Sequence, residues 1–175
     1  MIAHTGIRRK KQSAVAVSGN AMAAAGVGMA LAHDGEKICM LELGYSEPLL
    51  QHLFQMDNNA GLSELLADKA DLEHLILQAK ANRRLTNVYV IHQGYTRVDW
   101  QDNGPVLHAL IRALGRKFHR VILSVPDLSE SPRMIQLIAA LGVDRCLLDC
   151  PGQPTPMLQH KLAPLIQQGA LQLIH

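Results

Sequence analysis

The chain has 175 residues, of which 48% are hydrophobic and 18% charged, and its net charge at pH 7 is +2. This length fits one domain with a single buried core. The weak net charge and the aromatic content of 3% disfavour nucleic acid as a main partner. Because no apolar run approaches the roughly 18–20 residues of a membrane span, we expect a cytoplasmic protein without a transmembrane segment.

Short apolar runs predict six strands, at 14–19, 38–44, 87–94, 120–127, 145–150 and 171–175. Helical patterns separate them, at about 20–34, 46–55, 61–81, 104–117, 130–141 and 155–168. Apolar runs without alternation are typical of strands buried on both faces, and the regular succession of strands and helices is typical of right-handed crossovers. The sequence therefore predicts a three-layer α/β fold, with a mostly parallel sheet covered by helices on both faces.

The predicted organisation is a basic N-terminal arm over residues 1–13 followed by one domain over 14–175. The arm contains the sequence "RRKK" at 8–11. Four basic residues without an apolar anchor are typical of an exposed solubilising tail, and they could also give weak contact with an anionic lipid surface or an acidic partner.

The first predicted strand runs directly into a short turn and a helix, which is where many α/β proteins hold a phosphate. A P-loop requires several glycines, a Lys and a Ser or Thr, and none of these follows Gly19 in the required order. Gly26 and Gly28 lie two turns into the helix, where we expect them to permit close packing on the sheet. What remains is a helix N-terminus that could attract a weak anion, with Ser18 and Asn20 as helix caps.

No residue pattern predicts a metal or a cofactor. The three cysteines fall in or beside strand-like runs, where buried thiols are expected: Cys39, Cys146 and Cys150. Three carboxylates fall at the ends of predicted strands, namely Glu42, Asp127 and Asp149. They could form a cluster for metal binding or acid–base chemistry, but capping or solvated carboxylates are the favoured interpretation.

Residues 14–150 resemble the MinD/ParA-type P-loop ATPases with a deviant Walker motif, and most of all the cytoplasmic domains of bacterial tyrosine kinases of capsule and exopolysaccharide export. The most specific part is 35–76, which reads "GEKICMLELGYSEPLLQHLFQMDNNAGLSELLADKADLEHLI". It is similar to the family's stretch in which a strand ends in Asp-x-Asp, Pro-Leu-Leu-x-x-Leu-Phe follows, and then Gly-Leu-Ser-x-Leu-Leu. "NVYVIHQG" and "KFHRVILSVPD" resemble its next strand and its Walker B strand.

The chain departs from the family at the positions that carry the chemistry. The family's Gly-Lys-Ser/Thr falls on residues 19–21, its second-strand Asp on Glu42 and its Walker B Asp on Ser124. Phosphoryl transfer depends on such charged and metal-binding groups. The resemblance therefore implies a pseudo-ATPase that is not an enzyme and holds no cofactor. Its vestigial nucleotide site would comprise Ser18, Gly19, Asn20, Ala21, Glu42, Ser124 and Asp127.

The resemblance further implies a regulatory or scaffold subunit of a bacterial membrane-associated machine, for polysaccharide synthesis or export. The expected partner is a second copy, an active relative or a membrane-embedded export component, and such a partner could recruit the cytoplasmic chain to the inner membrane. A candidate surface follows the second strand, and its residues could equally pack on the sheet: Tyr45, Leu49, Leu50, Leu53 and Phe54. Two alternatives stay open: a nucleotide or small-anion sensor that binds without hydrolysis, and an enzyme of other chemistry that uses Glu42 and Asp127.

Overall fold

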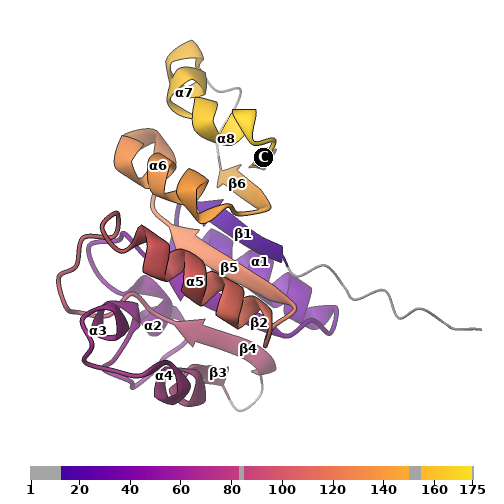
Figure 1. The fold of residues 1–175 in the computed structure, drawn as a ribbon. Helices are drawn as coiled ribbons and strands as arrows, with labels where there is room; N and C mark the ends of the chain where they lie inside the picture. The colour runs from indigo at the N-terminus through magenta and orange to yellow at the C-terminus, as the bar shows by residue number, and fades with distance from the viewer. Residues whose placement is uncertain (1–12, 83–84, 150–154, 175) are drawn as a thin grey trace, which may run out of the picture.

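The structure is a computed structural model that describes residues 13–82, 85–149 and 155–174. Its strands form one seven-stranded sheet in the order β3-β4-β2-β5-β1-β6-β7 (Figure 1). The strands are β1 (Ser13–Ser18), β2 (Ile38–Glu42), β3 (Lys80–Asn82), β4 (Leu85–Ile91), β5 (Arg120–Val125), β6 (Arg145–Asp149) and β7 (Leu171–Ile174). Every neighbouring pair is parallel except β3 with β4. The predicted six strands and mostly parallel sheet are confirmed.

Helices cover both faces of the sheet, as predicted. They are α1 (Ala21–His33), α2 (Leu49–Leu53), α3 (Leu62–Leu66), α4 (Leu72–Gln78), α5 (Gly104–Gly115), the 3-10 helix η1 (Leu128–Glu130), α6 (Pro132–Leu141), α7 (Pro156–Lys161) and α8 (Ala163–Gln167). Figure 1 shows α5 and α6 in front of the sheet and α1 behind it. Of the basic arm expected at 1–13, residues 1–12 lie outside the described residues, and Ser13 begins β1.

Two long predicted helices are each divided in two. The helical pattern at 61–81 breaks at Asp68, whose φ is 55°, and starts again at Asp71, whose carboxylate accepts a hydrogen bond of 2.8 Å from the His74 amide. The pattern at 155–168 breaks where Pro164 enters the first turn of α8, since proline has no amide hydrogen to continue the α7 ladder. The remainder of the first pattern forms β3, the strand that the sequence did not predict.

The register of the strands sorts their side chains onto the two faces. Val15, Ile122 and Met40 are paired across β1, β5 and β2, and they pack in the cluster beneath α1. The next row, which includes Ala16, Leu123 and Leu41, packs in the cluster beneath α5 and α6. This alternation follows from the two-residue period of a strand, so each inner strand is apolar throughout.

Close packing of α1 on the sheet depends on one of its two glycines. A Cβ on Gly28 would lie 2.7 Å from the Met40 sulfur, whereas a Cβ on Gly26 would meet nothing within 4 Å. The expectation of close packing is therefore right for Gly28 and wrong for Gly26, which faces outward. The helix ends as predicted near Gly35, whose φ of 82° is readily adopted only without a side chain.

The cysteines that the structure describes lie in the core. Cys39 and Cys146 are buried and free, and burial raises the pKa of each thiol to about 12. Cys150 lies outside the described residues. The two described thiols therefore act as small apolar side chains, as the sequence predicts.

Candidate functional site

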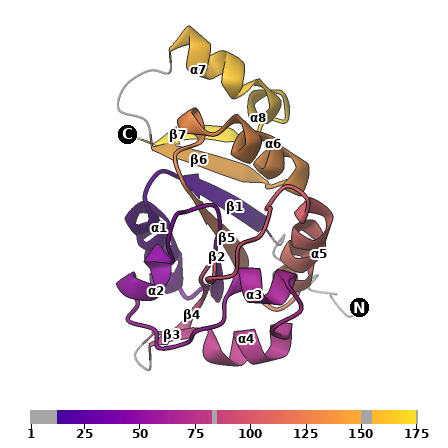
Figure 2. The same cartoon turned by 90° about the vertical axis from the view of Figure 1, so that its left-hand side faces the viewer.

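The residues predicted to form a vestigial nucleotide site lie at the carboxyl ends of β1, β2 and β5. This edge of the sheet faces the viewer in Figure 2. Between β1 and α1 the chain makes a turn of two residues, Gly19 and Asn20. The Gly19 amide donates to the Val125 carbonyl at 3.1 Å, and the Asn20 side chain accepts from the Ala23 amide at 2.9 Å. Asn20 is the N-cap of α1, as predicted, and Ala21 is buried.

Ser18 has a different role from the one predicted. Its hydroxyl accepts a hydrogen bond of 3.0 Å from the Leu128 amide and donates one of 3.4 Å to the Pro126 carbonyl. It therefore ties β1 to the segment after β5 and does not cap α1. The Asp127 carboxylate accepts from the Ser129 amide at 2.8 Å, so Asp127 caps η1.

Glu42 is buried at the end of β2, where it caps helix α2. Its Oε1 accepts hydrogen bonds of 2.8 Å from the amides of Leu49 and Leu50, and its Oε2 accepts one of 3.2 Å from the Gln93 amide. Burial raises the pKa of Glu42, and the three hydrogen bonds oppose that rise. The carboxylate thus accepts its hydrogen bonds from backbone amides of the protein itself, and it joins the ends of β2 and β4.

Tyr45 links the carboxyl ends of β1, β2 and β5. Its hydroxyl lies 2.8 Å from the Val125 carbonyl, 3.1 Å from the Ser124 hydroxyl and 3.5 Å from the Gly19 carbonyl. The Gln93 side-chain amide accepts from the Tyr45 amide and donates to the Tyr45 carbonyl, both at 2.9 Å. Burial raises the pKa of Tyr45 to about 12, so its hydroxyl stays protonated and can donate.

The sequence placed Tyr45 on an interaction surface near the nucleotide edge but did not include it among the residues of the vestigial site. The signal that could have found it is its position two residues after Leu43, at the end of a buried strand, in a chain with only three tyrosines. Together with Glu42, its hydroxyl fills the edge with internal hydrogen bonds.

The other candidate interaction residues differ in exposure. Leu50 is buried, while Leu49 and Phe54 are partly buried against the cluster beneath α1. Leu53 is 44% exposed and lines a shallow hollow with Met22 and Phe54. A partner surface at this place thus consists mainly of Leu53 and the outer side of α1, and the interaction stays a prediction.

A second site feature, which the sequence reasoning missed, is an open cleft between loop 44–48 and loop 93–100. It has a volume of about 490 Å³. Glu64 holds one wall, since its Oε1 accepts from the amides of Tyr95 at 2.9 Å and Thr96 at 2.7 Å. Partial burial acts to raise the pKa of Glu64, but these backbone hydrogen bonds and the one from Gly61 outweigh it and lower the pKa to about 2.

Metal binding finds no support in the part of the chain that the structure describes. No group of three His, Cys, Asp or Glu side chains there could hold a metal ion. Glu42 and Asp127, the pair proposed for other chemistry, are each bonded to backbone amides of a following helix. The described residues also include no helix long and apolar enough to cross a membrane.

Comparisons with known proteins identify the fold. No family model matches the chain, and no curated protein matches it by sequence. The chain is similar to the kinase domain of Escherichia coli tyrosine kinase ETK, at 17% identity over 95% of this chain and 68% of that one, with a TM-score of 0.72. It is similar to the VpsO kinase domain, at 18% identity over 95% and 85% of the two chains, with a TM-score of 0.70.

A third similar structure is the MinC:MinD cell division protein complex of Aquifex aeolicus, at 12% identity over 92% of this chain and 67% of that one, with a TM-score of 0.69. The predicted MinD/ParA-like, P-loop ATPase-type fold is therefore confirmed. The expectation that the chain is not an enzyme is contradicted, because the similar structures are kinases and ATPases, which are enzymes.

Proposed function

We propose that this chain, which has the MinD/ParA-like fold, is a regulatory or scaffold subunit of a bacterial membrane-associated machine for polysaccharide synthesis or export. On this proposal residues 14–175 work as one domain in the cytoplasm, and a protein partner brings it to the inner membrane. The partner is a second copy, an active relative or a membrane-embedded export component. The likeness to tyrosine kinase domains supports the setting, and the hydrogen bonds of Tyr45 support a role in binding.

The observation that supports the proposal is that side chains of the protein itself form hydrogen bonds at the carboxyl ends of the strands. The Tyr45 hydroxyl bonds to Val125 and Ser124, and Glu42 bonds to the amides that open α2. These contacts stabilise the edge without a ligand, since the buried Glu42 carboxylate and the Tyr45 hydroxyl each have hydrogen-bond partners. A surface that is stable in this way can present α2 to another protein in one conformation.

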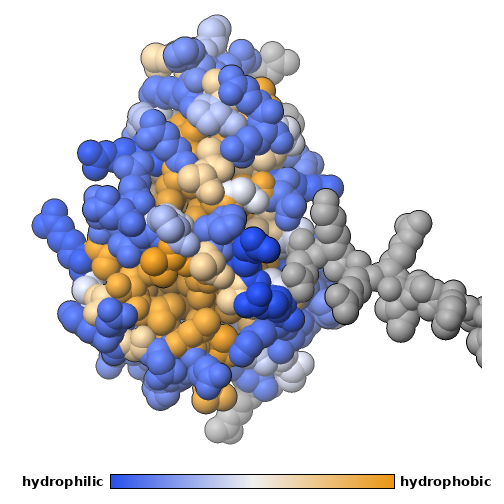
Figure 3. Space-filling view, in the orientation of Figure 1, coloured by the Kyte–Doolittle hydropathy of each residue, from blue (hydrophilic) through white to orange (hydrophobic). Residues whose placement is uncertain are grey.

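Exposed apolar residues supply candidate contacts. Leu53 and Met22 lie on the face of α1 and α2, at 44% and 69% exposure. On the opposite face, Figure 3 shows hydrophobic surface gathered over α3 and the start of α5, where Val106 is also exposed. Apolar areas of this kind often mark protein contacts.

The test compares two exposed leucines. Leu53→Arg alters the proposed surface, whereas Leu77→Arg alters α4, where Leu77 is also exposed. Each variant is used as bait in an affinity pull-down from the native host, and its mass in solution is measured by light scattering. We expect Leu53→Arg to lose a partner or a self-associated form that the Leu77→Arg variant and the unaltered chain retain. Equal partners and equal mass for all three proteins would remove this surface from the proposal.

A second candidate, small-anion or nucleotide sensing, is favoured by the start of α1. Its N-cap Asn20 is exposed at the carboxyl edge of the sheet, where the helix dipole favours a negative charge. Calorimetric titration with Mg-ATP and with inorganic phosphate tests this candidate, and hydrolysis and phosphoryl transfer are assayed in the same samples. A dissociation constant below about 10 μM, roughly −7 kcal/mol, would favour sensing over the scaffold role.

A further inference from the structure

Half of the chain's aromatic side chains line the cleft between loop 44–48 and loop 93–100. The sequence contains two Phe, three Tyr and one Trp. Of these, Tyr45, Tyr95 and Trp100 line the cleft. They come from two loops that are about 50 residues apart in the sequence, so the concentration arises from the fold and not from a local run.

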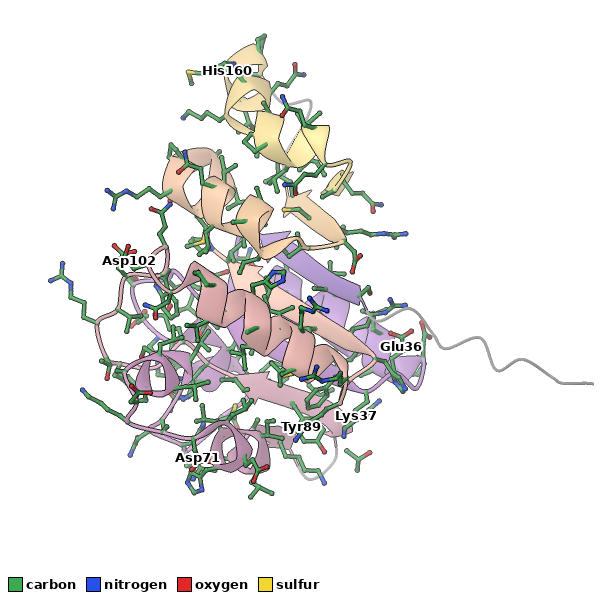
Figure 4. All side chains as sticks on the ribbon, in the orientation of Figure 1. Glu36, Lys37, Asp71, Tyr89, Asp102 and His160 are labelled. Atoms are coloured by element: carbon green, nitrogen blue, oxygen red, sulfur yellow. The ribbon has the colours of Figure 1, made fainter. Side chains whose placement is uncertain are left out.

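The aromatic residues outside the cleft are explained by packing. Tyr89 and Phe118 pack edge to face, with ring centroids 5.0 Å apart, and the Lys37 ammonium lies 5.1 Å from the first centroid and 4.9 Å from the second. Figure 4 labels Lys37 and Tyr89 at this place. Phe54 packs against the core beneath α1. Tyr45 and Trp100 also pack partly against the core, but core packing does not account for Tyr95, which is 59% exposed.

The walls of the cleft are held in place by hydrogen bonds. The Tyr95 hydroxyl donates to the Gln51 side-chain oxygen, and the Thr96 amide donates to the Ser63 hydroxyl at 3.1 Å and to Glu64. On the other wall, Gln93 holds the backbone of Tyr45 through two hydrogen bonds. The rings are therefore arranged before any ligand arrives, which reduces the entropy lost on binding.

The rim of the cleft combines donors with acceptors at nearly balanced charge. Glu47, His52 and Arg97 are exposed there. Within the described residues, no hydrogen bond or ion pair engages their side chains. A carboxylate that accepts, a guanidinium that donates and an imidazole that can do either are thus available to a ligand.

This combination fits a sugar ring. A pyranose presents apolar C–H faces, which pack on the negative faces of aromatic rings, and hydroxyl groups that both donate and accept hydrogen bonds. A nucleotide fits less well, because its phosphates bring several negative charges to a rim with one guanidinium and one carboxylate. A wholly apolar ligand would leave the polar rim without partners.

We propose that this cleft binds a pyranose unit of an oligosaccharide. The inference goes beyond the proposed function, because it assigns a ligand that is not a protein, and it is supported by the cleft alone. Tyr95 and Trp100 supply the apolar contact, Arg97 and Glu47 the hydrogen bonds to hydroxyl groups, and Glu64 positions the loop that carries Tyr95.

The test uses Trp100, which is the chain's single tryptophan and so reports on this cleft alone. The whole protein is titrated with oligosaccharides of glucose, galactose, mannose, N-acetylglucosamine and glucuronate, and tryptophan fluorescence is recorded. Saturation-transfer NMR on the same samples detects sugar protons in contact with protein. We expect a saturable fluorescence change and saturation transfer with at least one oligosaccharide of this panel.

Variants assign the binding to the cleft. We expect Tyr95→Ala to weaken it about five- to tenfold, the order expected for one aromatic contact. Tyr95→Phe keeps the ring and should keep most of the affinity, and Leu77→Ala, a change of an exposed side chain on α4, should leave binding unchanged. Arg97→Ala, at a second exposed position, should also weaken binding. It replaces Tyr95→Ala in the test if that variant does not fold.

Three results would overturn the inference. The first is the absence of both signals with every oligosaccharide of the panel. The second is binding that Tyr95→Ala and Arg97→Ala leave unchanged, and the third is a fluorescence response to Mg-ATP at a lower concentration than to any sugar. Because the test needs no partner protein, its failure is distinguishable from failure of the pull-down.

Discussion

The hydroxyl of Tyr45 donates a hydrogen bond of 2.8 Å to the carbonyl oxygen of Val125, across the carboxyl ends of β1 and β5. The residue comes from the loop after β2, so one side chain joins three strands at the edge where the fold would hold a ligand. The stability of the free protein should therefore depend on this contact.

We expect Tyr45→Phe to lower the free energy of unfolding by about 1–2 kcal/mol. The change leaves the ring in place but removes the hydroxyl that donates to the Val125 carbonyl and pairs with the Ser124 hydroxyl. Tyr89→Phe is the matched control, because within the described residues the Tyr89 hydroxyl has no hydrogen bond and only its ring makes contacts. Urea denaturation measures both, and equal midpoints would contradict a structural role for the Tyr45 hydroxyl.

Glu42→Gln should destabilise the fold by about 1–3 kcal/mol. A carboxylate accepts from the amides of Leu49, Leu50 and Gln93 with two oxygens, whereas an amide must turn its NH₂ group toward one of these donors. The exposed Glu47→Gln is the control, with an expected change within about 0.5 kcal/mol. A loss no larger for Glu42 than for Glu47 would show that the cap of α2 adds no stability.

The two glycines of α1 should respond to alanine with opposite signs. Gly28→Ala places a Cβ 2.7 Å from the Met40 sulfur and should cost about 1–3 kcal/mol. Gly26→Ala meets nothing within 4 Å and should stabilise the protein by about 0.5–1 kcal/mol, because alanine favours the helix. Thermal unfolding of the pair measures the difference, and a loss at Gly26 as large as that at Gly28 would contradict the helix orientation.

Stability should fall as the pH drops below about 6.5, partly through His92. Burial lowers the pKa of this buried side chain, and its Nδ1 accepts a hydrogen bond of 3.1 Å from the Gly94 amide, which a protonated ring cannot do. Below the pKa of the unfolded state, the unfolded chain takes up a proton that the folded chain does not, so unfolding is favoured.

The measurement is the urea midpoint of the unaltered chain at pH 7.5 and pH 5.5, compared with His92→Gln and with the exposed His160→Gln. The His92 variant should be less stable at both values but should lose less between them. His160→Gln should keep the full dependence. If His92→Gln also keeps the full pH dependence of stability, a group other than His92 is responsible for that dependence.

The sequence predicted the six parallel strands because each is a short run rich in apolar residues, and a strand covered by helices needs apolar residues on both faces. It missed β3 because that strand has three residues at the sheet edge, where burial imposes little pattern. The divided helix at 61–81 was missed because the leucine spacing continues across the break at Asp68.

The sequence predicted where the residues of the candidate site lie, but it did not predict their hydrogen-bond partners. Glu42 and Ser124 were placed at the strand ends correctly, since parallel strands end at one edge. Their partners could not be read from the sequence, because Gln93 and Tyr45 meet them through loops that are distant along the chain. The aromatic cleft was missed for the same reason, since its residues gather only when the two loops fold against each other.

Because α1 packs closely on the sheet, the oxidation of a buried methionine can report on the motion of this helix. The Met40 sulfur lies beneath Gly28 and is fully buried, whereas the sulfurs of Met22 and Met157 belong to exposed side chains. Peroxide reaches a buried thioether only when the overlying helix lifts, and the added oxygen then prevents the helix from returning to its place. The rate of oxidation at Met40, relative to the two exposed methionines, therefore records how often α1 leaves the sheet.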